Sequence, residues 1–65
     1  MKLGAALRTK REARGLSLRD MQARTGVSFV NISRIERGRI RRPTFRDVVK
    51  LAKALRMSLD SLTKL

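Results

Sequence analysis

The sequence predicts an all-α fold of five short helices that pack as one domain over residues 1–65. Apolar residues recur at intervals of three and four, and a Ser, Thr, Gly or Pro stands at the ends of most of these apolar segments. A chain of 65 residues has room for one small core, and it contains no Cys and no His. Disulfides and zinc therefore cannot stabilise the fold, which leaves helix packing, with or without a partner subunit.

The first helix is predicted over residues 3–14. Leu3, Ala6 and Leu7 fall on one face of such a helix and give it an apolar side to bury. Gly15 follows at the position where a left-handed residue commonly ends a helix.

The second and third helices are predicted over residues 17–24 and 29–37. The segment Ser17–Asp20 has the pattern of a capping box, in which a Ser and an acidic residue three positions later satisfy each other's backbone amides. Gly26 allows a positive φ in the connection, and Ser28 is a second candidate N-cap. Two short helices joined by such a turn form a helix-turn-helix motif.

The fourth and fifth helices are predicted over residues 45–55 and 59–63. Pro43 ends a basic loop because it cannot continue a helix. Thr44 is the candidate N-cap of the fourth helix. Apolar residues then recur at helical spacing in both segments.

The charge balance predicts a polyanionic partner. Seventeen Lys and Arg residues oppose five Asp and Glu residues, for a net charge of +12. Most of the basic residues are Arg, whose planar guanidinium pairs well with phosphates and guanine. The only aromatic residues are two Phe, no apolar run approaches the ~20 residues of a membrane span, and Arg8 interrupts any signal-peptide core. We expect a cytoplasmic protein that does not bind membranes.

Catalysis is not expected. The chain has no His, Cys or Tyr, and its five acidic residues are scattered, mostly at cap positions. No general base or metal site can be assembled from them, and no cofactor or small-molecule ligand is indicated.

From Leu3 to Leu62 the order of landmarks resembles the Cro and phage-repressor class of helix-turn-helix regulators, also called the xenobiotic-response-element family. The resemblance implies a lambda-repressor-like domain, of bacterial or phage origin, whose second and third helices form the DNA-binding motif. The matching positions are Leu7, Arg11, Leu16–Ser17, Gly26–Ser28, Ile32–Gly38, Pro43, Leu51–Leu55 and Ser58–Leu62.

Two positions depart from the family pattern. Leu18 stands where members commonly have a Gln that packs over a backbone phosphate, so that contact is not expected here. Gln22 stands where a small residue usually faces the next helix, so shifted or looser packing of the second helix against the third is expected.

In a helix-turn-helix motif the second helix lies in the major groove, with its N-terminal half at the base edges. Asn31 can pair with adenine, Arg34 with guanine, and Phe29 and Val30 can contact thymine methyl groups. Three alternatives stay open: Phe29 as a core residue, Asn31 as a capping residue and Arg34 as a solvated charge. The candidate base contacts are Ser28, Phe29, Val30, Asn31 and Arg34.

Contacts to the DNA backbone are expected from the loops and helix ends. Arg41 and Arg42 have a second option, the adjacent minor groove. A solvated basic loop is the remaining interpretation, although six Arg between positions 34 and 46 repel one another unless a polyanion neutralises them. The backbone or minor-groove candidates are Arg11, Ser17, Arg19, Arg37, Arg39, Arg41, Arg42 and the amide end of the helix near Phe45.

The resemblance also implies an ion pair between Arg11 and Glu36, and a dimer interface that includes Met57, Leu62 and Leu65. The predicted function is a repressor that binds double-stranded DNA as a homodimer on a palindromic operator. Two alternatives are an antitoxin or adaptor that uses the fold for protein binding, and a nonspecific nucleic-acid binder. Both a complete protein and one domain of a longer repressor fit this length.

Overall fold

The computed structural model describes residues 2–40 and 43–57, and every regular element in these two ranges is a helix. The helices are α1 (Lys2–Ala13), α2 (Leu18–Thr25), α3 (Phe29–Glu36) and α4 (Phe45–Ala54). Each helix end lies within one residue of its prediction, so the all-α class and the first four helices are confirmed. The fifth helix, predicted over residues 59–63, lies outside the described residues.

Short-range hydrogen bonds start α2, α3 and α4, as the capping patterns predict. Ser17 Oγ accepts from the Asp20 amide at 3.0 Å while Asp20 Oδ2 accepts from the Ser17 amide at 2.8 Å, which completes the capping box. Ser28 Oγ and Thr44 Oγ1 accept the matching amides of α3 and α4, both at 3.2 Å. Gly26 ends α2 in the left-handed region, with a φ of 77°.

Each of the four helices contributes to one apolar core. Burial of a large apolar side chain stabilises a fold by roughly 1.5–3 kcal/mol relative to leaving it exposed. The buried apolar residues of this core therefore supply most of the stabilisation. Among the described residues, no buried side-chain nitrogen or oxygen lacks a hydrogen-bond partner. The buried cluster consists of Leu7, Met21, Val27, Ile32, Ile35, Leu51 and Leu55.

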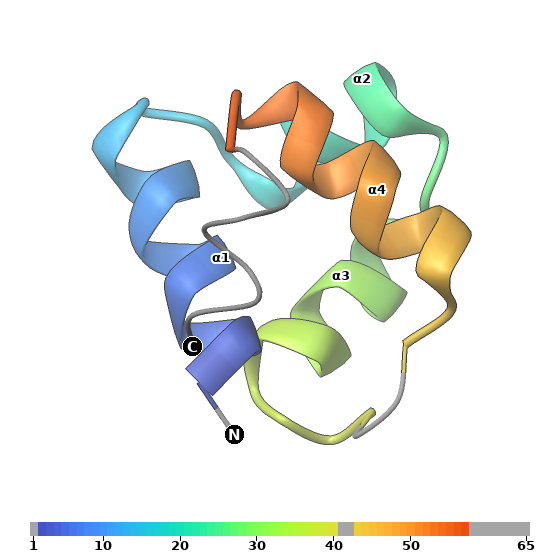
Figure 1. The fold of residues 1–65 in the computed structure, drawn as a ribbon. Coiled ribbons are helices and arrows are strands. Elements are labelled where there is room, and N and C mark those ends of the chain that lie inside the picture. The colour runs from blue at the N-terminus through green and yellow to red at the C-terminus, as the bar shows by residue number, and fades with distance from the viewer. Residues whose placement is uncertain (1, 41–42, 58–65) are drawn as a thin grey trace.

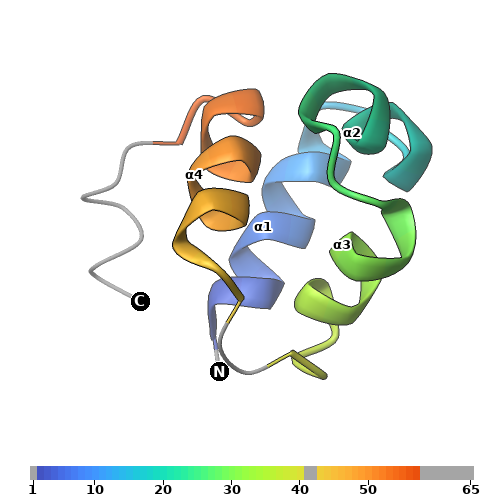
Figure 2. The ribbon, with the colours of Figure 1, turned by 90° about the vertical axis from the view of Figure 1, so that its right-hand side faces the viewer.

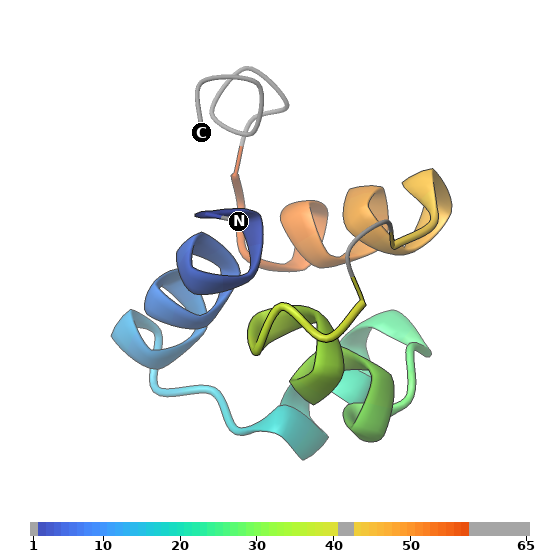
Figure 3. The ribbon, with the colours of Figure 1, turned by 90° about the horizontal axis from the view of Figure 1, so that it is seen from below.

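The helices are arranged so that the outer surface of α3 faces away from α4. In Figure 1, α4 crosses the molecule beside α2 and α3, and in the turned view of Figure 2 α4 and α3 lie at opposite sides with α1 behind them. Seen from below in Figure 3, α2 and α3 lie together along one side and α4 lies along the other. The two helices of the predicted motif therefore share one side of the molecule.

Gly4 lets α1 approach the end of α3 closely. A Cβ atom at this position would collide with the carbonyl oxygen of Ile35 and would lie 2.8 Å from the carbonyl oxygen of Glu36. Only a residue without a side chain fits between these backbones. The crossing of α1 over α3 thus depends on Gly4.

Candidate nucleic-acid interface

The two faces of α3 differ in the way that a base-reading helix requires. Ile32 and Ile35 are buried in the core, whereas Asn31 and Arg34 are exposed on the outer face. Val30 is 43% exposed, which is unusual for a large apolar side chain in this structure. The outer face therefore presents an amide, a guanidinium and an apolar group side by side.

The start of α3 is fixed by two side chains from outside the helix. Ser28 Oγ accepts from the Asn31 amide, so Ser28 provides the cap and Asn31 contributes only its backbone to it. Gln22 Oε1 accepts from the Phe29 amide at 2.8 Å. Gln22 thus joins α2 to the first residue of α3 by a specific hydrogen bond.

Phe29 holds Arg19 against the surface of the motif. The guanidinium carbon of Arg19 lies 4.5 Å from the centroid of the Phe29 ring, in a cation–π arrangement. Phe29 is half-buried, so it is neither a full core residue nor a freely exposed ring. The stacked guanidinium is pre-positioned at the start of α2, where its N–H groups can donate to a phosphate.

A groove of about 370 Å³ runs along the outer face of α3. Leu18, Phe29 and Val30 make up the apolar part of its lining. Three arginines also line it, and no acidic side chain does. Its lining residues are Leu18, Phe29, Val30, Ser33, Arg34, Arg37 and Arg39.

Leu18 is the site residue whose role the sequence did not predict. The sequence marks it only by the absence of a Gln, yet it forms a wall of the groove while packing partly against the core. The sequence signal for this role is an apolar residue directly after an N-cap Ser, in a motif whose helix starts face the ligand.

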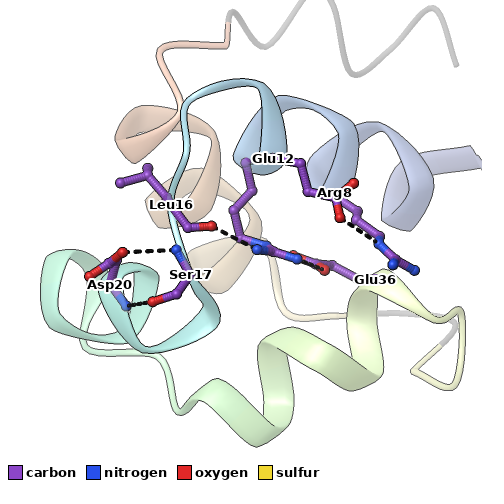
Figure 4. Close-up of polar contacts among 7 residues, drawn as sticks. Arg8, Glu12, Leu16, Ser17, Asp20 and Glu36 are labelled. Atoms are coloured by element: carbon purple, nitrogen blue, oxygen red, sulfur yellow. Dashed lines mark hydrogen bonds and ion pairs between the residues drawn. The ribbon is translucent and has the colours of Figure 1, made fainter.

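The ion pair between Arg11 and Glu36 is present and lies beneath this surface (Figure 4). Arg11 Nε donates to Glu36 Oε2 at 2.8 Å and Nη2 donates to Oε1 at 3.1 Å, while Nη1 donates to the Leu16 carbonyl at 2.7 Å. The hydrogen bonds to Glu36 raise the pKa of Arg11, although burial acts in the opposite direction. Three of the five guanidinium N–H groups are thereby occupied, so a phosphate contact would have to use the other two.

The exposed carboxylate of Asp20, in the first turn of α2, is held in its ionised form. Hydrogen bonds from the backbone amide and hydroxyl of Ser17 lower the pKa of Asp20 below its usual value. Asp20 therefore contributes its charge to the start of α2, where the helix dipole favours a negative group.

The remaining predicted contacts divide into three groups. Arg37 and Arg39 lie at the groove, as described. Phe45 is 75% exposed at the start of α4 and does not line the groove, and Met57 is half-buried against the core. Those outside the described residues are Arg41, Arg42, Leu62 and Leu65.

Residues 2–40 and 43–57 contain no helix with the length and apolar character needed to cross a bilayer. The same ranges bring no three His, Cys, Asp or Glu side chains together as metal ligands.

The comparison with known proteins agrees with this geometry. Residues 2–65 match the family described as the helix-turn-helix domain. The chain belongs to this family. Two relatives, from Mycobacterium tuberculosis strains CDC 1551 and H37Rv, are each 39% identical to the helix-turn-helix chain over 59 residues. Both carry the name uncharacterized HTH-type transcriptional regulator.

The match covers 91% of this helix-turn-helix chain and 41% of each relative, so the chain spans less than half the length of the relatives it matches. No solved structure is significantly similar to it.

Proposed function

We propose that this helix-turn-helix domain binds double-stranded DNA in a sequence-specific manner and regulates transcription, with α3 in the major groove. The observation that carries the proposal is the outer face of α3, where Asn31 and Arg34 are exposed beside a groove without acidic residues. These two side-chain types make the bidentate contacts that distinguish adenine and guanine. The family and the names of the relatives support DNA-binding regulation.

The surroundings of α3 provide backbone contacts. Arg19 is held on the Phe29 ring at one end of the helix, and Arg37 and Arg39 lie at the other end. Phosphates flank the major groove on both sides, so basic side chains at both ends of α3 fix its register while the central residues read bases. The hydroxyl of Ser17 adds a neutral donor to this arrangement.

The domain acts as a homodimer and as a repressor in this proposal. A unit with one recognition helix reads only a few base pairs, and two copies on half-sites about one helical turn apart supply the missing affinity and specificity. Binding over a promoter then blocks transcription. A regulator of this kind works in the cytoplasm, on the nucleoid.

Selection of bound sequences from a random duplex pool tests the proposal. The expected result is an enriched palindromic motif with half-sites separated by about ten base pairs. A single non-repeated motif would contradict the dimer, and an unenriched pool would contradict sequence-specific regulation. A pool selected at two salt concentrations serves as a control, because nonspecific phosphate binding weakens strongly with salt.

A further inference from the structure

Leu18, Phe29 and Val30 form the apolar part of the groove on α3, to which the proposed function assigns no ligand. Leu18 comes from the start of α2, and Phe29 and Val30 come from the start of α3, so two helices are needed to form it. Val30 is exposed and Leu18 and Phe29 are half-buried, so together they offer an apolar contact to a ligand of this strongly basic chain.

We propose that this apolar part of the groove binds the C5-methyl group of a pyrimidine in the major groove. The domain then prefers thymine over uracil, and 5-methylcytosine over cytosine, at one position of each half-site. This inference rests on the proposed function, because it names the chemical group that the face of α3 selects. In the major groove, the thymine C5-methyl is the apolar group that an unmodified base pair presents.

The wall of the site is rigid before any ligand binds. The amide of Phe29 is held by Gln22 at 2.8 Å, and one face of its ring is covered by Arg19. Leu18 packs partly against the core. A preformed apolar surface loses little conformational freedom when a methyl group docks on it, so the small gain from that contact is retained as affinity.

The spacing along α3 predicts the neighbour of the methylated base. Val30 and Arg34 are four residues apart, which corresponds to about 6 Å along a helix. Successive bases on one strand rise by about 3.4 Å, so the two side chains lie roughly two base steps apart. Arg34 pairs best with guanine. The preferred half-site therefore has a thymine or 5-methylcytosine within two steps of a guanine.

The charges around the groove favour DNA over a second copy of this chain. Arg34, Arg37 and Arg39 line the groove, and none of its lining residues is acidic. Two copies packed through this surface would bring six arginines together without a counter-charge. DNA offers the methyl group and the acceptors for these arginines on one surface.

Single-base analogues test the inference. In a duplex that carries the selected operator, each thymine is replaced in turn by uracil, which removes only the methyl group. Loss of one buried methyl-sized group corresponds to about a four-fold weaker affinity, so we expect that loss at one thymine in each half-site. At the same position, 5-methylcytosine should bind about four-fold tighter than cytosine.

Two substitutions assign the effect to the groove. Val30→Ala and Leu18→Gln should each bring the thymine-to-uracil affinity ratio close to one. Val49→Ala is the same truncation on α4, away from the groove, and should leave the ratio unchanged. Thermal melting verifies that the variants fold; Val30 is exposed enough for its truncation to be tolerated.

Three outcomes would overturn the inference. Equal affinity for thymine and uracil at every position of a site that is still sequence-specific would contradict the methyl contact and leave the proposed function standing. A ratio that survives in both groove variants would place methyl recognition elsewhere. Loss of self-association in Val30→Ala, measured by sedimentation without DNA, would identify the groove as a contact between copies. An unenriched selection pool would instead contradict the proposed function itself.

Discussion

The guanidinium of Arg11 and the carboxylate of Glu36 meet with side-chain exposures of only 11% and 5%. Because both charges are withdrawn from water, removal of one leaves the other without a partner. Glu36→Ala should therefore lower the free energy of unfolding by about 3 kcal/mol. Glu12 pairs with Arg8 at 3.4 Å on an exposed surface, so Glu12→Ala should cost less than about 1 kcal/mol. Urea denaturation of both variants measures the difference, and equal losses would contradict a structural role for the inner pair.

Arg34 and Arg39 are both predicted to contact DNA, but with different consequences. Arg34→Ala should relax the base preference at one position of each half-site, at a cost of about 1–3 kcal/mol for the preferred sequence. Arg39→Ala should weaken all sequences by a similar factor, because a phosphate contact carries no base information. Affinities for a panel of single-base operator variants separate the two patterns. An equal loss of affinity for every operator variant in Arg34→Ala would show that Arg34 does not read a base.

The packing of α1 on α3 predicts that replacing a helical glycine by alanine destabilises this fold, which is opposite to the usual effect. Alanine normally stabilises a helix by about 1 kcal/mol relative to glycine. At Gly4, however, the new methyl group would collide with the Ile35 carbonyl, and the two helices would have to separate. Gly4→Ala should therefore lower the free energy of unfolding by about 1–3 kcal/mol. Thr9→Ala, at an exposed position of the same helix, is the control. A rise in the free energy of unfolding for both substitutions would contradict the close approach of α1 to α3.

The capping box at α2 predicts a dependence of stability on acid pH. The pKa of Asp20 is lowered in the folded state, chiefly by the amide of Ser17, so its ionised form stabilises α2 at pH values above its usual pKa of 3.8. This contribution is lost as the pH falls below 3.8 and through the folded-state pKa. Asp20→Asn keeps an acceptor oxygen without a charge. The difference in melting temperature between the native protein and this variant should narrow in that range, and a constant difference would exclude Asp20 as the titrating group.

Local signals made the helices predictable, and contacts between helices made parts of the site unpredictable. Ser17, Ser28 and Thr44 cap their helices through bonds to residues three positions away, so their roles follow from the adjacent sequence. Gln22 reaches Phe29 across a turn whose geometry depends on the packing of α2 and α3, and its hydrogen bond could not be read from spacing. The same holds for Gly4, whose role depends on a carbonyl 31 positions later in the chain.

At the scale of the whole molecule, the helices divide structural and binding roles between two sides. The core joins all four helices, while the exposed face of α3 lies on the side away from α4 (Figures 2 and 3). Arg11 and Glu36 pair with each other between α1 and the end of α3, so together they add no net charge to the surface. The candidate contacts that line the groove therefore lie on one side, whereas Phe45 stands apart at the start of α4. Binding through the groove side is the geometry that would let two copies sit on one face of a duplex.

The salt dependence of binding tests that geometry. Each phosphate neutralised by a basic side chain releases counterions, so the logarithm of the affinity falls with the logarithm of salt by about 0.9 per contact. A dimer with five to ten contacts should give a slope of roughly −5 to −9 on the full operator, and an isolated half-site that binds one copy should give about half of that. Arg39→Ala should reduce the steepness by about two on the operator and about one on the half-site. Fluorescence anisotropy over a salt series measures all four slopes. Equal slopes on the operator and on the half-site would show that one copy binds each duplex, and would contradict the dimer while leaving DNA binding intact.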